Sequence, residues 1–354
     1  MKHPDLVIKP SPIIASLCYS IFRIEPYTSC SFGCVYCYGK WYLSEKTPRP
    51  VEKHIKLFNR VAKRIKKYNL HPYPFRLSTL VDPFQEAERI HKISYLALSV
   101  ALKREYPIIV NTKSPLISED PWITVLKELS AKNLLVVQLS SASPFKIKEL
   151  EPKAPSFTEL LGLAKNLSKE KVPVVFRYQP LIPGLSDIPE VIEDAFKELK
   201  NANIKHIIVE YLRTNIDLLN LFKKHALDKT PYTLRWDAYS TDSKIVKPPL
   251  SYRKEKLLEI KSITHEVGVK IATCKEPILI DNTLDCCGFY LFSKYLKRPT
   301  LREKDIRSVE AIAYPPSSIN LEKYPKIIRK TLKWYNRVLN KIIENSQLEV
   351  LDFR

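Results

Sequence analysis

Glycine is scarce in this sequence, and several features that would decide its class are missing. Only six of the 354 residues are glycine. No apolar run is long enough to cross a bilayer, so a membrane partner is not expected. The first residues lack the apolar core of a signal peptide, which favours a cytoplasmic protein. The sequence also has no internal repeat and no low-complexity segment, and β-rich runs alternate with helical patterns instead.

Disulfides are not expected either, although the chain holds seven cysteines. Their number is odd and the expected compartment is reducing. The cysteines cluster at positions 18, 30, 34, 37, 274, 286 and 287, and such clustering indicates metal binding. Four of the glycines lie in the motifs described below: Gly33, Gly39, Gly184 and Gly288. A chain that otherwise avoids glycine keeps it where the backbone requires it.

Acidic residues are outnumbered, with 38 Asp and Glu against 58 Lys and Arg, which gives a formal net charge of +20. A surplus of this size suits a polyanionic partner such as nucleic acid, and a generally basic proteome would also produce it. Basic residues concentrate on two predicted helices, 53–68 and 325–345. Their lysines suit phosphate contacts or, equally, a solvated helix face.

Strand and helix patterns alternate six times over the first 230 residues. The predicted strands are 20–27, 76–81, 107–112, 134–140, 172–178 and 205–212. The predicted helices are 53–68, 86–105, 121–131, 156–168, 188–201 and 215–226. This order predicts an α/β fold with a parallel sheet, an incomplete (β/α)6 TIM-like barrel whose chemistry lies at the carboxyl ends of the strands.

The regular alternation of predicted strands and helices ends after residue 230. A helix over 252–267 leads to a short strand over 269–273, a cysteine-bearing stretch and the long basic helix 325–345. We therefore expect a barrel domain over 1–230 and a mostly helical C-terminal extension over 231–354, packed beside the barrel.

Three cysteines follow the first predicted strand with the spacing C-x3-C-x2-C: Cys30, Cys34 and Cys37. Three thiolates on a short loop can hold three irons of a cubane and leave the fourth iron open for a substrate. Gly33 would let the loop turn tightly. The alternatives are a structural zinc knuckle or buried free thiols. A zinc knuckle would need a fourth ligand, and no His or Cys follows on the loop.

The motif C-x3-C-x-aromatic-C after the first strand of a βα barrel resembles the signature of the radical S-adenosylmethionine (SAM) superfamily. The resemblance implies a [4Fe–4S] cluster on the three cysteines, with SAM on the open iron. It further implies reductive cleavage of SAM to a 5′-deoxyadenosyl radical that abstracts hydrogen, an electron donor such as a reduced flavodoxin- or ferredoxin-like protein, and Tyr36 near the adenine. The protein positions a cofactor that carries the chemistry.

Four further stretches resemble the spore photoproduct lyase-like (DNA repair photolyase-like) branch: 79–88, 111–114, 151–156 and 179–187. The resemblance implies that Lys113 pairs with the SAM carboxylate, that Ser140 or Ser141 binds the ribose, and that the 181–184 backbone with Ile182 lines the adenine pocket. Asp82, at the end of the second strand, is a candidate catalytic residue. The alternative for Lys113 is a surface lysine, and for Asp82 a helix cap.

One departure from this branch concerns the lyase reaction itself. Spore photoproduct lyases carry a hydrogen-donating cysteine just before the strand-two aspartate, and this chain has Leu80 and Val81 there. The lyase's hydrogen return therefore cannot run in the same way, and the substrate is left open.

The remaining cysteines form a second group, with Cys274 after the strand 269–273 and Cys286 and Cys287 shortly after it. They are candidates for a second metal cluster, with Cys18 or a substrate as the fourth ligand. Redox-active thiols or a buried structural pair are the alternatives.

The sequence thus predicts a radical SAM enzyme that modifies or repairs a nucleic acid or another macromolecule. A radical SAM enzyme acting on a protein, peptide or small metabolite is the first alternative. A non-catalytic Fe–S or zinc protein that binds nucleic acid is the second, and only the enzyme would need SAM.

Overall fold

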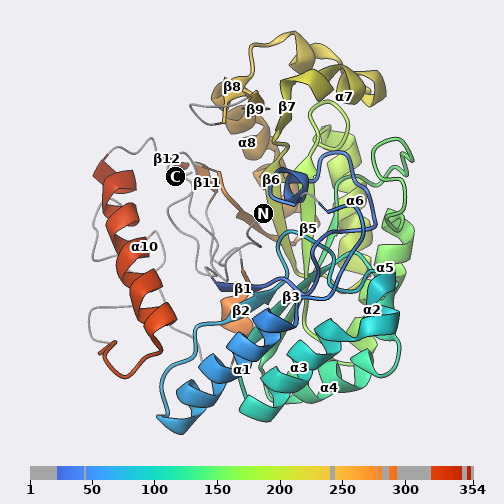
Figure 1. The fold of residues 1–354 in the computed structure, drawn as a ribbon. Helices are drawn as coiled ribbons and strands as arrows, with labels where there is room; N and C mark the ends of the chain where they lie inside the picture. The colour runs from blue at the N-terminus through green and yellow to red at the C-terminus, as the bar shows by residue number, and fades with distance from the viewer. Residues whose placement is uncertain are drawn as a thin grey trace.

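A computed structural model describes residues 22–43, 45–239, 244–276, 278–280, 287–292, 320–344 and 349–351. Its centre is a parallel sheet of seven strands in the order β1-β2-β3-β4-β5-β6-β10 (Figure 1). These strands are β1 (Phe22–Ile24), β2 (Phe75–Leu77), β3 (Ile108–Thr112), β4 (Leu135–Ser141), β5 (Val174–Leu181), β6 (His206–Tyr211) and β10 (Lys270–Thr273). The predicted α/β partial barrel is confirmed.

The seventh strand comes from a part of the chain that we expected in the C-terminal extension. β10 pairs in parallel with β6, with Lys270 opposite His206 and Thr273 opposite Val209. A boundary at residue 230 therefore falls before the last strand of the sheet. The reason is that Ile271 and Ala272 are buried on the two faces of the sheet, where they lie beside the buried Ile207 and Ile208 of β6.

Nine helices of the described segments surround the sheet or extend from it: α1 (Glu52–Lys67), α2 (Glu86–His91), α3 (Ile93–Arg104), α4 (Trp122–Ala131), α5 (Phe157–Lys169), α6 (Pro189–Asn201), α7 (Leu219–His225), α8 (Leu250–Val267) and α10 (Lys326–Glu344). The amphipathic pattern of α1 buries Ile55, Phe58 and Ile65 and leaves the lysines outside. Among the described residues, no helix is both long and apolar enough to span a membrane.

The single helix predicted over 86–105 is wrong, because Lys92 takes a left-handed conformation (φ 51°) that separates α2 from α3. The buried Glu88 carboxylate explains the break. It accepts hydrogen bonds from the backbone N–H groups of Ser94 and Tyr95, both at 2.9 Å, and so satisfies the first turn of α3.

A small antiparallel sheet lies beyond the carboxyl end of β6, in the order β7 (Thr214–Asn215), β9 (Ile245–Lys247), β8 (Asp237–Ala238). The buried Glu276 fastens it to the end of β10. Its carboxylate accepts from Lys247 Nζ at 2.7 Å and from Arg253 of α8. A parallel pair, β11 (Ile278–Ile280) and β12 (Glu349–Leu351), follows β10.

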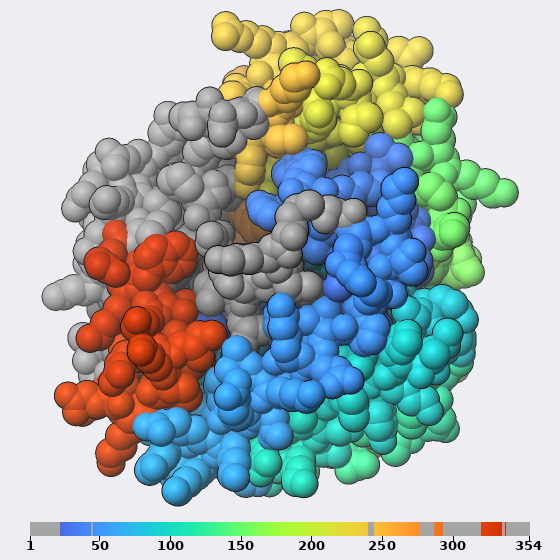
Figure 2. Space-filling view, viewed as in Figure 1, coloured from blue at the N-terminus to red at the C-terminus, as the bar shows by residue number. Residues whose placement is uncertain are grey.

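The segment that leads into the C-terminal helix α10 lies near the end of α1, and Figure 2 shows atoms of the two regions side by side on one face of the molecule. Arg64 Nε donates to the Lys323 carbonyl at 2.9 Å, just before α10 begins. Tyr324, Ile328 and Leu332 are buried in the main core. This segment therefore packs against the core of the sheet.

Candidate active site

The loop that carries Cys30, Cys34 and Cys37 connects β1 to α1, and two other segments hold it from either side. On one side, the buried Gln85 accepts from Ser31 N and donates to the Ser29 carbonyl, both at 2.8 Å. On the other side, Val35 N donates to the Leu150 carbonyl at 2.9 Å. Protein hydrogen bonds thus hold the loop backbone on both sides.

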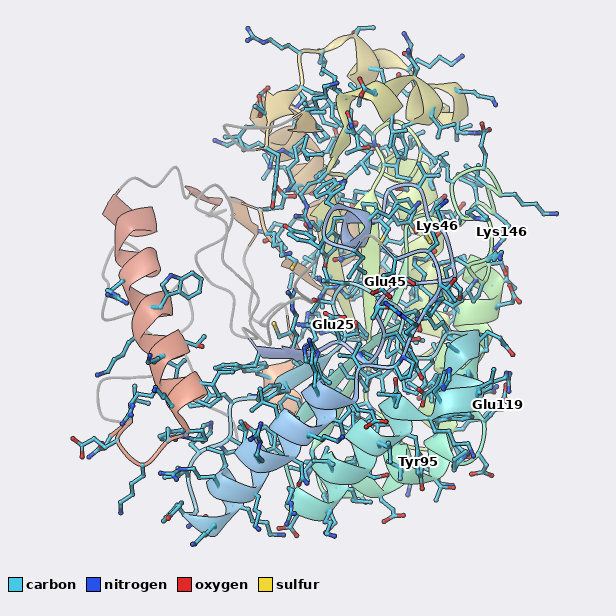
Figure 3. The ribbon with its side chains drawn as sticks, viewed as in Figure 1. Glu25, Glu45, Lys46, Tyr95, Glu119 and Lys146 are labelled. Carbon is cyan, nitrogen blue, oxygen red and sulfur yellow. The ribbon has the colours of Figure 1, made fainter. Side chains whose placement is uncertain are left out.

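Residues 79–82 form a platform under the cysteine loop, and Glu25 shapes it. The Glu25 carboxylate, fully buried at the end of β1 (Figure 3), accepts from Thr79 N at 2.9 Å and Leu80 N at 3.3 Å. These bonds draw the backbone out of β2, which ends at Leu77 instead of continuing to residue 81 as predicted. A Cβ atom on Gly39 would lie 2.3 Å from the Leu80 carbonyl oxygen, so only glycine permits the contact.

Cys34 is buried, and Cys30 and Cys37 are half-buried. Burial raises the pKa of the Cys30 thiol to about 12 and that of the Cys34 thiol to about 11, and it raises the pKa of Cys37 as well. The Lys113 ammonium acts in the opposite direction on Cys34 and Cys37. A bound metal centre would supply the positive charge that these sulfurs need as thiolates.

In the described part of the chain, no three His, Cys, Asp or Glu side chains meet around a point where one metal ion would bind. This finding does not bear on a cubane, because each cysteine then binds a different iron and the sulfurs need not converge. Three cysteines on one anchored loop, with Asp82 N donating to Cys30 Sγ at 3.4 Å, fit that donor set.

Lys113 lies in the interior, with its side chain 13% exposed, and is not a surface lysine. Its Nζ donates to the Ser140 carbonyl at 2.9 Å, lies 3.4 Å from Glu151 and sits 5.8 Å from the centre of the Tyr36 ring. The Tyr36 hydroxyl donates to the same glutamate. The structure therefore brings Tyr36, Lys113 and Ser140 together beside Cys34.

Glu151 is the residue of this group for which the sequence analysis predicted no role. It lies in the stretch 151–156, and only its position before Pro152 distinguished it. In the structure it joins Tyr36 to Lys113 in the interior.

Asp82 binds the ends of two neighbouring strands together. Its carboxylate accepts from Thr112 Oγ1 at 2.8 Å, Lys113 N at 2.7 Å and Phe84 N at 2.9 Å. Burial raises the pKa of Asp82, and these three donors act against the rise. The residue at the N-cap of α2 is Gln85, so Asp82 does not occupy the predicted cap position.

Ile182 begins a tight turn after β5. Its carbonyl accepts from Leu185 N and Ser186 N, both at 3.0 Å. Gly184 has a φ of 67°, and a Cβ there would lie 1.8 Å from the Asp228 carbonyl oxygen. Ile182 belongs to an apolar cluster that also contacts Tyr36, so the predicted adenine residues lie in one region.

Cys274 and Cys287 both contact a polar network across the inner face of the sheet. Arg177 Nη2 donates to Cys274 Sγ at 3.2 Å and Arg76 Nη2 donates to Cys287 Sγ at 3.4 Å. The two guanidinium groups share the Gln138 side-chain oxygen, at 3.0 and 2.6 Å. Cys18 and Cys286, the other predicted ligands, lie outside the described residues.

The family model described as the radical SAM superfamily matches residues 24–197, from β1 through most of α6, with all three loop cysteines inside. Residues 24–197 therefore form a radical SAM domain. This confirms the predicted class of enzyme and its cofactors, a [4Fe–4S] cluster and SAM. No curated protein matches the sequence.

Solved structures share the fold. A mutant of spore photoproduct lyase aligns with 71% of this chain and 76% of its own, at 15% identity and a TM-score of 0.57. Another, with bound AdoMet and dinucleoside spore photoproduct, aligns with 75% of this chain and 80% of its own, at 15% identity and a TM-score of 0.55. Streptococcus suis SuiB bound to precursor peptide SuiA covers 73% of this chain and 49% of its own, at 14% identity and a TM-score of 0.46.

Proposed function

We propose that Cys30, Cys34 and Cys37 hold three irons of the cluster and that SAM binds at the fourth. The observation that carries this proposal is the meeting of Lys113, Glu151 and Tyr36 beside Cys34, with Lys113 Nζ 3.4 Å from Glu151. When bound, the cluster and SAM supply reductive cleavage to methionine and a 5′-deoxyadenosyl radical for hydrogen abstraction.

The residues around the loop have distinct parts in this proposal. Lys113 supplies the cation for the SAM carboxylate, and the Ser140 carbonyl holds its ammonium at the end of β4. The half-buried Ser140 hydroxyl is placed for the ribose. Ile182 and Tyr36 provide an apolar wall for the adenine. Asp82 positions Lys113 relative to residues 79–82 and is not itself a catalytic residue in this proposal. The reason is that three donors already occupy its carboxylate.

For the substrate, we propose a nucleic acid or another macromolecule. The net charge of +20 supports a polyanionic partner. Exposed basic residues follow the outer faces of α1 and α10, which the Arg64–Lys323 hydrogen bond joins into one surface. They are Lys53, Lys56, Arg60, Lys63, Arg64, Lys66, Lys67, Lys326, Lys330, Lys333 and Arg337. The fold shared with a structure that holds a dinucleoside spore photoproduct agrees with this substrate class.

The experiment is an anaerobic assay of reconstituted protein with dithionite, SAM and candidate nucleic acids. The proposal expects 5′-deoxyadenosine and methionine, and a mass change in one nucleic acid. Cys34→Ala should abolish both. SAM cleavage with no change in any nucleic acid would favour a protein, peptide or small-metabolite substrate. A preparation that binds zinc and never iron would favour a non-catalytic protein.

Two accessory features belong to the same proposal. A second cluster on Cys274, Cys286 and Cys287 would receive N–H···S hydrogen bonds from Arg177 and Arg76, which suits sulfur ligands of an anionic cluster. A reduced flavodoxin- or ferredoxin-like protein of the cytoplasm would supply the electron.

A further inference from the structure

Tyr38, the aromatic residue that follows the third loop cysteine, has one contact at its hydroxyl and another at the face of its ring. Tyr38 begins the short helical turn Tyr38–Trp41, directly after Cys37. Its hydroxyl donates to the Thr79 carbonyl at 2.5 Å, on the platform that Glu25 shapes. The Arg213 guanidinium carbon lies 4.9 Å from the centre of its ring. Tyr38 therefore links the cysteine loop to the far side of the barrel, beyond β6.

Arg213 is itself tightly placed, although it lies on an irregular segment between β6 and β7. Its Nη2 is 2.8 Å from the buried Glu210 carboxylate, and its Nη1 donates to the Tyr239 hydroxyl at 2.7 Å. The Tyr239 ring lies 5.1 Å from the guanidinium carbon. Because Glu210 neutralises Arg213, the guanidinium acts on Tyr38 chiefly through its planar shape and position.

This arrangement parallels the one around Tyr36. There, Lys113 lies over the ring of Tyr36 and pairs with Glu151. Here, Arg213 lies over the ring of Tyr38 and pairs with Glu210. Each group consists of an aromatic residue next to a loop cysteine, a cation and a buried carboxylate. Only the first group has a part in the proposed SAM site, so the second needs a reason of its own.

We propose that Arg213 is a positioning residue that fixes Tyr38 and, through it, the Cys37 end of the cluster loop. The proposal rests on the proposed cluster at Cys30, Cys34 and Cys37. Near this turn, the Lys40 N–H donates to the Cys37 carbonyl at 3.2 Å and Gly39 packs against Leu80, and both contacts involve the backbone alone. Lys275 Nζ also lies 5.1 Å from the centre of the Tyr38 ring, but it is a point charge without the planar group of Arg213.

The test measures iron loss from reconstituted protein to a chelator, and the EPR spectrum of the reduced cluster. Arg213→Lys keeps the charge but removes the planar group. Iron loss should become about tenfold faster, since the planar contact with the Tyr38 ring is lost and the hydrogen bond to Tyr239 is weakened. The EPR line shape should change, while the melting temperature of the metal-free protein stays close to wild type. The matched control is Arg104→Lys, which alters a half-buried arginine whose Nε donates to Asn59 Oδ1 at 3.0 Å, between α3 and α1.

Wild-type iron loss and EPR in a stably folded Arg213→Lys would overturn the proposal, and so would equal acceleration in Arg104→Lys. If Arg213→Lys does not fold, the variant Tyr239→Phe tests the proposal instead. It removes only the hydrogen bond that orients the guanidinium, so it should accelerate iron loss in the same direction by a smaller factor, and no acceleration overturns the proposal. A wild-type protein that binds no cubane would instead refute the proposed function.

Discussion

Asp82 accepts a hydrogen bond from the backbone N–H of Lys113, with 2.7 Å between Oδ2 and N. The backbone N–H of the same aspartate donates to Cys30 Sγ at 3.4 Å. One residue thus connects the first cysteine of the loop to the lysine proposed to bind SAM. The position of the lysine relative to the cluster loop depends on this carboxylate.

Asp82→Asn should weaken both cofactor sites. The amide keeps one acceptor oxygen where the carboxylate had two, so at least one of the three buried donors loses its partner, at a cost of about 1–3 kcal/mol. We expect a lower melting temperature, less iron per chain after reconstitution and weaker SAM binding. Asp120→Asn, at an exposed aspartate, is the control. An Asp82→Asn protein with normal iron and SAM affinity would show that Asp82 does not organise the site.

Lys113→Ala should lower SAM affinity while the cluster persists. A charge-assisted contact is worth on the order of 1.5–3 kcal/mol, which corresponds to roughly a 10- to 150-fold rise in Kd. Isothermal titration with anaerobic, reconstituted protein measures the Kd, and iron analysis confirms the cluster. Lys127→Ala, on the outer face of α4, is the matched control. Equal affinities in wild type and Lys113→Ala would mean that the SAM carboxylate lies elsewhere.

A second cluster would be visible in the iron content. If Cys274, Cys286 and Cys287 bind one, iron per chain should exceed that of a single cubane. The Cys286→Ala/Cys287→Ala double variant should lose the excess and still cleave SAM. Wild-type protein with the iron of one cubane would leave these cysteines as thiols hydrogen-bonded to Arg177 and Arg76.

Local patterns predicted the framework well, because strand and helix periodicity follows from which face of each element is buried. They also placed Asp82 and Lys113 at neighbouring strand ends, where the structure finds them bonded to each other. The features that were missed depend on distant partners. Glu88 separates α2 from α3 because its carboxylate accepts hydrogen bonds from the first turn of α3, beyond the left-handed Lys92. Arg213 and Tyr38 are far apart in the sequence and come together only when the sheet has formed. Neither contact leaves a periodic signal in the sequence.

Stability should fall as pH rises through the range set by Asp187. Its carboxylate accepts from Gly184 N at 2.6 Å and from the Tyr252 hydroxyl at 2.7 Å, yet burial dominates and raises its pKa from 3.8 to about 6. The folded state then binds more protons than the unfolded state between about pH 4 and 6. Stability is therefore lost across that window, and the loss is complete above pH 6.

The variant Asp187→Asn cannot ionise, so its stability relative to wild type should increase from pH 4 to pH 6. Urea unfolding of both proteins at several pH values measures the difference. A difference that does not change with pH would mean that Asp187 keeps an ordinary pKa in the fold. Asp217→Asn, at an exposed aspartate, controls for the general effect of losing one charge.

If α10 contacts nucleic acid, binding should depend steeply on salt. Each neutralised phosphate contributes a slope of roughly −0.9 for duplex and −0.7 for single strands in log affinity against log salt. Reversing Lys326, Arg329 and Lys333 to Glu should weaken binding to all sequences and flatten the slope. SAM cleavage without substrate should persist, because the cysteine loop is held by Gln85, Leu150 and residues 79–82 and not by these three side chains.

The matched control reverses Lys148, Lys165 and Lys169 to Glu, which changes the net charge equally on the α5 side, away from α10 in Figure 1. If the surface of α1 and α10 is the contact, this control should retain most of the affinity and a nearly unchanged slope. Equal losses in both triple variants would mean that the +20 charge attracts nucleic acid diffusely. Weak binding of the wild type even at low salt would move the expected substrate to a protein, peptide or small metabolite.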